Sequence, residues 1–388
     1  MIEINKAGEN WILINSCVYN FFIHHRIKEK GFTMSIELQN RIYSNDYADI
    51  ILPYTYTTPE RFLEYFQRNF PQIINDTYGF VHVPVQPNSA EDPSKFVSSI
   101  IPQLYVPLDY TSLENTGIIS AQTQPFLNLN GNGILIGFID TGILYTHPAF
   151  QNPGKRTRIV RIWDQTIPTE DGSGPFNYGT EYTQEQINLA LQNENPLSIV
   201  PSTDTNGHGT FIAGVAAGSS APLAEFTGAA PQASIAVVKL KEAKQHLKDF
   251  YFFSGDIPVY QETDIIAAIS YLTQLSKNLG MPLVLCIALG SNQGDHAGNT
   301  PLELSLQRNA LNPGVISVCA AGNEGNQDHH FFAKMERDTE PTIVEINVPN
   351  NCDGFYMELW GDVPALFSVG LRSPLGESIK CHSFSLIF

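Results

Sequence analysis

Residues 131–143 read Gly-Asn-Gly-Ile-Leu-Ile-Gly-Phe-Ile-Asp-Thr-Gly-Ile, and this stretch decides the fold. A glycine-rich turn leads into a continuous apolar run, as expected of a strand that is buried on both faces. Asp140 stands at the carboxyl end of that strand, and Gly142 follows two residues later. An aspartate at this position can orient a histidine, hold a metal ion or simply cap the next turn.

Similar apolar runs continue along the chain and alternate with helical patterns. Residues 234–240, 282–288 and 315–320 each read as a buried strand. Apolar residues at helical spacing predict helices over 262–279 and 302–311. Parallel strands that alternate with helices form a doubly wound sheet, whose ligands bind at the carboxyl ends of the strands. We therefore expect an α/β fold with a parallel sheet.

A small α/β unit precedes this core. A strand begins near Asp49, a helix is opened by the cap Thr58 and by Pro59, and residues 78–85 form a second strand. Residues 86–97 are rich in Pro, Ser, Asn and acidic residues, which is typical of a linker.

The pattern changes again after residue 335. Residues 342–348, 354–360 and 366–371 alternate in strand fashion, with turns between them and no helix. We expect these segments to begin an antiparallel β module.

Both ends of the chain have unusual sequences. Met34 follows Lys-Glu-Lys-Gly, which the purine-rich codons of a ribosome-binding site can encode, so we expect translation to begin at Met34. Residues 381–388 end in mid-pattern without a cap or polar tail, and we expect a C-terminal truncation there. The expected organisation has four parts: a non-native extension over 1–33, an α/β unit with linker over 34–100, an incomplete sheet domain over 101–335, and a truncated β module over 336–388.

Composition and charge exclude several classes of protein. Of the 388 residues, 43% are hydrophobic, which is too many for a disordered chain. The chain has 22 Lys and Arg against 39 Asp and Glu, and its net charge of −17 argues against nucleic acid and anionic membranes as partners. The apolar stretch 11–23 is too short to span a bilayer and lacks the basic start of a secretory signal, so we expect no signal peptide and no membrane contact.

The five cysteines form no CxxC pair. Cys286 and Cys319 fall in apolar runs, and we expect both to be small buried residues. An odd number of cysteines without a pattern favours a reducing compartment.

Residues 205–218 carry a second motif, Thr-Asn-Gly-His-Gly-Thr, followed by small and apolar residues of a predicted helix. His208 lies between two glycines at the helix N-terminus, where the helix dipole disfavours the charged imidazolium. Such a histidine is suited to act as a general base near pH 7. The alternative is a histidine that only caps the helix.

A third motif, Ala-Ala-Gly-Asn-Glu-Gly-Asn, covers residues 320–326 at the end of a predicted strand. The carboxamide of Asn323 could donate a hydrogen bond to an oxygen that becomes negative during acyl transfer. A plain turn would use the same residue types.

Together the three motifs resemble those of the subtilisin-like serine proteases (subtilases), in which Asp-Thr-Gly, His-Gly-Thr and Ala-Ala-Gly-Asn precede a Gly-Thr-Ser. The resemblance covers roughly residues 115–330. It implies the subtilisin-like three-layer α/β fold and a serine endopeptidase that acts on peptide or protein substrates. It also implies that Asp140 orients the imidazole of His208, the general base, and that Asn323 is the oxyanion-hole donor.

Leu289 and Gly290 resemble the edge strand with which this family binds the substrate backbone. A long insertion between Asp140 and His208, together with the β-rich stretch after Asn323, is similar to the clostridial Csp-type subtilases of spore germination. That resemblance implies a bacterial, cytoplasmic or spore-associated protein. Two further parts are implied: a prodomain over 47–85 that binds the chain's own active site, and a jelly-roll insertion that begins over 342–380.

The family's nucleophile segment is missing from the sequence. No Gly-Thr-Ser occurs, and the serines after Asn323 lack the flanking residues that would place a nucleophile. The chain is either truncated or a pseudoprotease that binds a peptide or partner without cutting it. We favour truncation, because a pseudoenzyme is expected to keep its fold complete.

No cofactor and no metal ion are expected. The histidine pairs at 24–25 and 329–330 lack the spacing of a zinc site, and their position in loops explains them.

Overall fold

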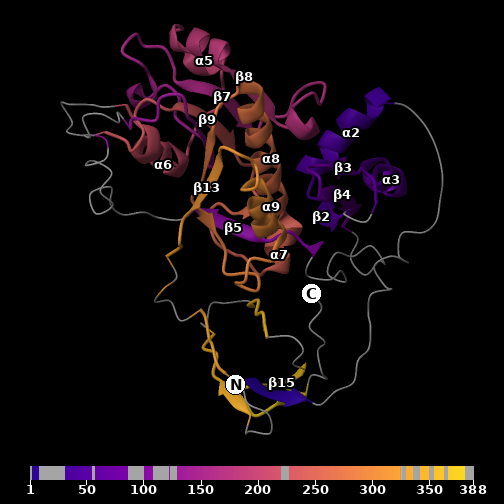
Figure 1. The fold of residues 1–388 in the computed structure, drawn as a ribbon. Coiled ribbons are helices and arrows are strands. Elements are labelled where there is room, and N and C mark those ends of the chain that lie inside the picture. Colours follow the sequence, from indigo (N-terminus) through magenta and orange to yellow (C-terminus); the bar gives the residue numbers. More distant parts are fainter. Residues whose placement is uncertain are drawn as a thin grey trace. The chain divides into compact units, whose positions relative to one another are not determined.

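The protein is described by a computed structural model, which covers residues 2–7, 31–54, 57–85, 100–107, 122, 129–219, 227–323, 325, 329–334, 341–348, 354–361 and 366–380. The chain forms two compact units (Figure 1). The larger unit is Glu29–Asn323, and the smaller unit combines Met1–Lys28 with Glu324–Phe388. The predicted linker 86–97, the apolar stretch 11–23 and the tail 381–388 lie outside the described residues.

A six-stranded sheet forms the centre of the larger unit. Its strand order is β13-β11-β6-β9-β7-β8, and all neighbours pair in parallel except β7 and β8. The strands are β6 (Leu135–Asp140), β7 (Ile159–Asp164), β8 (Thr180–Thr183), β9 (Ser234–Lys239), β11 (Leu283–Ile287) and β13 (Val315–Cys319). The predicted α/β fold with a mostly parallel sheet is confirmed.

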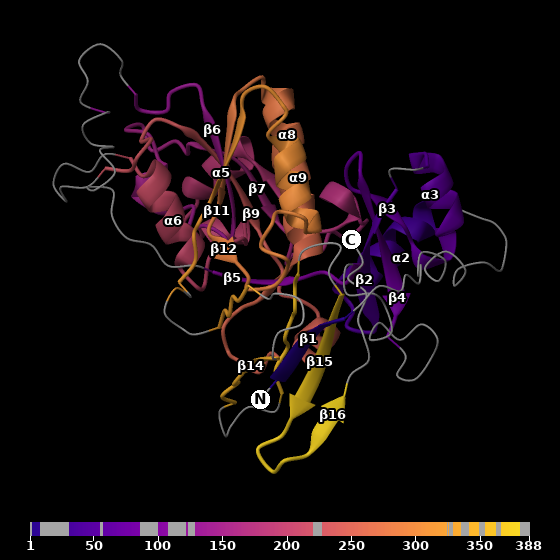
Figure 2. The same ribbon diagram turned by 60° about the horizontal axis from the view of Figure 1, so that its bottom comes forward.

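Helices cover both faces of this sheet (Figure 2). On one face lie α8 (Glu262–Leu279) and α9 (Pro301–Asn309), and on the other α5 (Gln184–Leu191) and α6 (His208–Ala217). The result is a three-layer sandwich with the sheet in the middle. We call residues 129–219 and 227–323 the sheet domain.

Alternate side chains of β6 serve the two layers. Leu135 and Ile139 belong to the core beneath α8, whereas Ile136 and Phe138 belong to the core beneath α6. Between them, Gly137 allows α8 to pack closely, because a Cβ atom there would lie 2.9 Å from the Leu272 side chain. This strand is buried along its whole length, as the sequence predicts.

The N-terminal module (residues 31–54 and 57–85) contains a three-stranded antiparallel sheet of order β2-β4-β3. Its elements are α2 (Gly31–Tyr43), β2 (Tyr47–Pro53), α3 (Pro59–Tyr65), η1 (Gln67–Asn69), β3 (Gln72–Ile73) and β4 (Tyr78–Pro84). As predicted, Thr58 caps α3, since its side-chain oxygen accepts a hydrogen bond from the Arg61 amide. The predicted small α/β unit is therefore present.

Several short elements complete the larger unit. They are β5 (Leu104–Pro107), η4 (Pro148–Phe150), η5 (Pro175–Asn177), η6 (Pro196–Ser198), α7 (Gln245–Phe250), β10 (Tyr260–Gln261) and β12 (Leu289–Gly290).

The smaller unit contains an antiparallel sheet of order β14-β1-β15-β16. Its strands are β1 (Ile2–Ala7), β14 (Thr342–Val344), β15 (Leu366–Arg372) and β16 (Ser378–Lys380). The antiparallel character is as predicted, but residues 354–360 form no strand. Phe355 and Trp360 in that segment are exposed. The alternating apolar residues therefore did not indicate a strand here.

One prediction about burial is wrong. Residues 315–320 were expected to form a buried strand, yet β13 is the edge of the sheet, with Ile316 60% and Val318 51% exposed. Cys319 is exposed as well, and Cys286 is only partly buried. An apolar run shows that a segment suits a strand, but it does not show whether a neighbour covers that strand.

Candidate active site

Two predicted residues meet at the carboxyl edge of the sheet. Asp140 ends β6 and His208 begins α6, and Asp140 Oδ1 lies 2.7 Å from His208 Nδ1. The aspartate side chain is 2% exposed and the histidine side chain 16% exposed. A shielded carboxylate beside a more accessible imidazole is the arrangement that an oriented general base requires.

The hydrogen bond selects the tautomer of His208. A carboxylate can only accept, so Nδ1 carries the proton, and the lone pair of the neutral ring is on Nε2. Asp140 Oδ1 also accepts from the Thr141 amide at 2.7 Å, while the buried Oδ2 accepts from none of the described residues. Its negative charge is therefore available to stabilise an imidazolium.

Close backbone packing brings the two residues together. A Cβ atom on Gly209 would lie 2.3 Å from the carbonyl oxygen of Gly142 and 3.1 Å from Asp140 Cβ. Only glycine permits this approach of α6 to the end of β6. Gly142 itself has a φ of +124°, a conformation that side chains other than glycine rarely adopt.

Asp204 is a site residue that none of the three sequence motifs contains. Its Oδ1 accepts from the Thr141 hydroxyl at 2.9 Å and from the Gly207 amide at 2.9 Å. Its Oδ2 accepts from the amide and the hydroxyl of Thr210 at 2.9 Å and 2.7 Å. Asp204 thus ties the segment after Asp140 to the first turn of the His208 helix.

The cap of α6 explains why this carboxylate is needed. The N-cap residue, Gly207, has no side chain to satisfy the amides of the first turn. Burial alone would raise the pKa of Asp204, but hydrogen bonds from Thr210, Gly207 and Thr141 lower it below the ordinary value. In the sequence, Asp204 could have been recognised as an acidic residue that shortly precedes a predicted helix whose N-cap is glycine.

Asn323 lies at the same edge of the sheet, in the exposed loop after β13. Parallel pairing places Ile139 beside Ile287 and Ile287 beside Cys319, so the chain leaves β13 on the side where Asp140 stands. No hydrogen bond among the described residues joins Asn323 to Asp140 or His208. The oxyanion role of Asn323 stays a prediction.

Leu289 and Gly290 form β12, the edge strand expected to bind substrate backbone, and that edge is occupied by the chain itself. Gly290 is paired with Val106 and Leu289 with Pro107, both in β5. On its other side, β5 pairs antiparallel with β10. The segment Leu104–Pro107 is therefore the middle strand of a three-stranded sheet, with both of its edges paired.

Tyr105 anchors that middle strand. It is 7% exposed, belongs to the main core, and its hydroxyl donates to Gln103 Oε1 at 3.1 Å. Nearby, the fully buried Glu262 accepts from the amides of Leu302 at 2.8 Å and Gln103 at 3.3 Å. Burial raises the pKa of Glu262 to about 7, which these two hydrogen bonds oppose.

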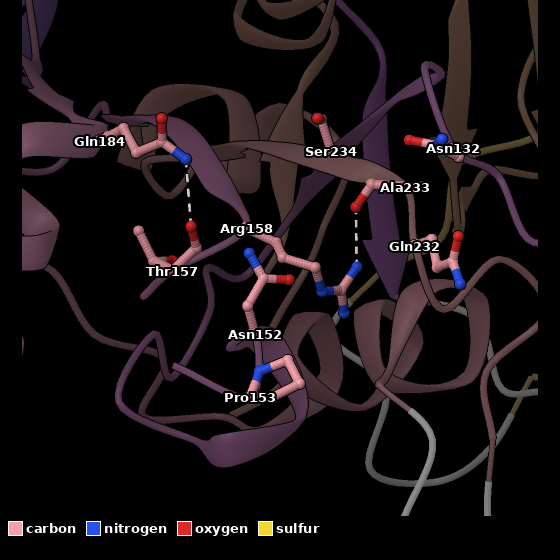
Figure 3. Close-up of a pocket in the computed structure, with 9 residues that line it drawn as sticks. All are labelled: Asn132, Asn152, Pro153, Thr157, Arg158, Gln184, Gln232, Ala233 and Ser234. Atoms are coloured by element: carbon pink, nitrogen blue, oxygen red, sulfur yellow. Dashed lines mark hydrogen bonds between the residues drawn. The ribbon is translucent and has the colours of Figure 1, made fainter. Parts of the chain in front are cut away.

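A separate recess of about 440 Å³ opens at the opposite edge of the sheet (Figure 3). It lies near the amino ends of β7 and β9 and is lined by Asn132, Asn152, Pro153, Thr157, Arg158, Gln184, Gln232, Ala233 and Ser234. Arg158 Nη1 donates to the Ala233 carbonyl at 2.7 Å, and Nη2 donates to those of Ala149 and Ala217. The guanidinium is thus engaged by backbone carbonyls of the fold. The recess is distinct from the Asp140–His208 site, because it lies at the amino ends of the strands and Asp140 ends β6.

Other polar candidates form no site. Glu170 and Asp171 lie in an exposed loop, and Asp295 accepts hydrogen bonds within its own turn. The described residues contain no group of three or more His, Cys, Asp or Glu placed to hold a metal ion. No helix in the described part of the chain is long and apolar enough to cross a membrane.

Comparison with known proteins shows to which family this chain belongs. Residues 131–356, more than half of the chain, match the subtilase family, Peptidase_S8. The subtilisin of Bacillus sp. (strain TA39) is 26% identical over 50% of this chain and 35% of its own length. The major intracellular serine protease of Bacillus subtilis (strain 168) is 26% identical over 55% of this chain and 50% of its own.

Two further proteins show the range of the similarity. Subtilisin-like protease SBT2.2 of Arabidopsis thaliana is 28% identical over 50% of this chain and 23% of its own length. The solved structure of the Clostridium perfringens CspB protease is 35% identical, with a TM-score of 0.48, over 56% of this chain and 41% of that chain. The chain thus spans half or less of the length of each of these relatives.

Proposed function

Because this chain belongs to the subtilase family of serine peptidases, we propose that it carries the acid–base pair and the substrate edge of an endopeptidase that hydrolyses peptide bonds. The observation that supports this most directly is the 2.7 Å hydrogen bond between Asp140 Oδ1 and His208 Nδ1. It lies at the carboxyl edge of a parallel sheet, beside a strand suited to bind peptide backbone.

In the proposed reaction, the attacking serine belongs to a segment outside these 388 residues, and His208 Nε2 accepts the proton of its hydroxyl as the oxygen attacks the scissile carbonyl. Asp140 keeps the ring in the required tautomer and stabilises the imidazolium that forms. Asn323 donates to the carbonyl oxygen as it becomes negative. His208 then gives its proton to the leaving amine, which completes formation of the acyl-enzyme.

The position of β5 supports a peptide as the substrate. Residues Leu104–Pro107 already pair with β12 through backbone groups, as a bound peptide would. We propose that the N-terminal module is a prodomain and that β5, which follows it in sequence, blocks the site in the manner of a substrate. A jelly-roll module, a bacterial cytoplasmic or spore location, and a role in spore germination belong to the same proposal.

A second function is favoured by one observation. The 388 residues contain no Gly-Thr-Ser segment. A chain with base and orienter but no attacking group would bind peptides without cutting them. The second proposal is therefore a pseudoprotease with a regulatory, peptide-binding role.

One experiment separates the two. The protein purified from the intact gene, whose DNA after codon 388 is also read for a Gly-Thr-Ser segment, is tested for hydrolysis of a fluorogenic peptide, for labelling by a fluorophosphonate probe, and for peptide binding by fluorescence anisotropy. His208→Ala and the exposed His147→Gln serve as test and control. Hydrolysis and labelling that only His208→Ala abolishes support the peptidase. Binding without hydrolysis or labelling supports the pseudoprotease, and the absence of all three contradicts both.

A further inference from the structure

The contact between the N-terminal module and the sheet domain encloses a group of charged side chains. Its centre is Asp49 in β2, which is 4% exposed. Asp49 Oδ1 accepts from Lys244 Nζ at 2.7 Å and from His82 Nδ1 at 2.6 Å, and Oδ2 accepts from Gln261 Nε2 at 2.6 Å. His82 belongs to the module, whereas Lys244 and Gln261 belong to the sheet domain.

Lys244 makes a second connection across the same contact. Its Nζ also donates to the carbonyl oxygen of Arg41 in α2 at 2.8 Å. Beside it, Lys241 Nζ lies 2.7 Å from Asp264 Oδ2. The Asp49 cluster, defined as Asp49, His82, Lys241, Lys244, His246, Gln261 and Asp264, thus contains two lysines and two aspartates. With neutral histidines its formal charge is zero.

Burial of a charge-balanced set is stable only while the balance holds. Burial alone would raise the pKa of Asp49, but Lys244 and His82 hold it well below the ordinary value. Removing one partner of a buried ion pair leaves an uncompensated charge, which is strongly destabilising. Asp49 therefore stabilises the contact only while Lys244 and His82 remain its partners.

Two histidines of the cluster are titratable, His82 buried and His246 partly buried. His82 is 2% exposed, and burial lowers its pKa despite the neighbouring Asp49, with Lys244 and Lys241 adding to the effect. Burial lowers the pKa of His246 to about 4, a shift that Lys244 and Lys241 reinforce and that Asp49 and Asp249 oppose. His246 Nδ1 is buried and accepts or donates no hydrogen bond among the described residues.

We propose that the Asp49 cluster holds the N-terminal module on the sheet domain at neutral pH, and that protonation of His82 and His246 in mild acid releases it. Two added protons would give the enclosed set a charge of +2, and the one further carboxylate that acts on His246, that of Asp249, is exposed to solvent. The release itself does not rest on the proposed function.

The direction of the pH effect follows from proton binding. Docking keeps both histidines neutral, so the released module and its docking surface bind more protons below the ordinary histidine pKa of about 6.5. Docking therefore weakens as the pH falls from about 6.5 towards 4. For each histidine that stays neutral in the docked state and has a pKa of about 6.5 in the released state, the equilibrium constant for docking falls by up to about 30-fold at pH 5.

The test is hydrogen–deuterium exchange of the intact chain at pH 7.5 and pH 5.0, corrected for intrinsic rates. We expect exchange at least tenfold faster at pH 5.0 in residues 47–53 and 241–250, on the two sides of the contact. Residues 135–140 and 234–239 of the central sheet should not change. Unchanged protection at the contact, or equal loosening of the central sheet, would overturn the proposal.

Variants locate the effect. His82→Gln combined with His246→Phe should remove most of the pH dependence, and Asp49→Asn should loosen the contact already at pH 7.5. The exposed Asp46→Asn is the matched control and should behave as wild type. A pH response that the double variant retains would contradict the assignment to these histidines. Peptide hydrolysis is not part of the readout, so a failed peptidase assay and a failed release remain distinguishable.

Discussion

Two aspartates of the site have different tasks at the scale of single residues. Asp140 contacts the imidazole of His208, whereas Asp204 holds the chain segments that present Asp140 and His208 to each other. Because α6 begins at a glycine cap, the carboxylate of Asp204 satisfies the donors of the first turn. Asp204 is thus a positioning residue for the Asp140–His208 pair.

Asp204→Asn should destabilise the protein by about 2–3 kcal/mol, because an amide replaces a charged acceptor of several hydrogen bonds. Urea unfolding measures this change. The exposed Asp256→Asn is the control and should change stability by less than about 0.5 kcal/mol.

The same pair of proteins tests the lowered pKa of Asp204. A carboxylate with a lowered pKa stabilises the fold fully above the ordinary Asp value of about 3.9, and that stabilisation is lost as the pH falls. The stability difference between wild type and Asp204→Asn should therefore shrink below about pH 4. A difference that stays constant down to pH 2 would contradict the charge-based role.

At the scale of elements, the approach of α6 to β6 decides whether the acid–base pair forms. Two glycines of α6 differ in their surroundings: Gly209 packs against the Gly142 carbonyl, whereas a Cβ atom on Gly214 would meet nothing within 4 Å. Substitution by alanine at both positions therefore separates the effect of close backbone packing on stability from the effect of helix propensity.

Gly209→Ala should cost about 2–3 kcal/mol, because the backbone that it meets cannot move aside. Gly214→Ala should stabilise the helix by about 0.5–1 kcal/mol. Thermal and urea unfolding check both values. Equal effects at the two positions would show that close backbone packing is not what positions His208.

The sequence predicts the elements of the larger unit well, because the Asp140 and His208 motifs lie at the ends of segments with clear strand and helix patterns. The apolar run before Asp140 and the glycines around His208 indicate both the strand–helix order and the residues that meet. Burial of β13 could not be predicted, since exposure of Ile316 and Val318 depends on what covers a sheet edge. Asp204 was missed because its role depends on a fold-dependent contact with Thr141.

At the scale of the whole molecule, a segment distant in sequence pairs with β12, the proposed substrate edge. Residues Leu104–Pro107 lie between Tyr260–Gln261 and Leu289–Gly290, more than 150 residues further along the chain. The buried side chain of Tyr105 holds this segment in place. The larger unit thereby contains both the Asp140–His208 pair and the segment that pairs with β12.

Tyr105→Ala should destabilise the larger unit by about 3–5 kcal/mol, as loss of a large buried aromatic does. It should also strengthen binding of a labelled peptide of sequence 103–108 at least tenfold, because β5 no longer competes for β12. Tyr65→Ala, at a side chain 44% exposed, is the control and should alter neither. Unchanged peptide binding in Tyr105→Ala would show that β5 does not block the edge.

The central claim is that Asp140 holds His208 in the tautomer of a general base, and nitrogen NMR of the histidine ring tests it most directly. At neutral pH the protein should show His208 protonated at Nδ1 and unprotonated at Nε2. In Asp140→Asn that preference should disappear while the fold is retained. A proton on Nε2 in the wild-type protein, or a tautomer unaffected by Asp140→Asn, would contradict the account.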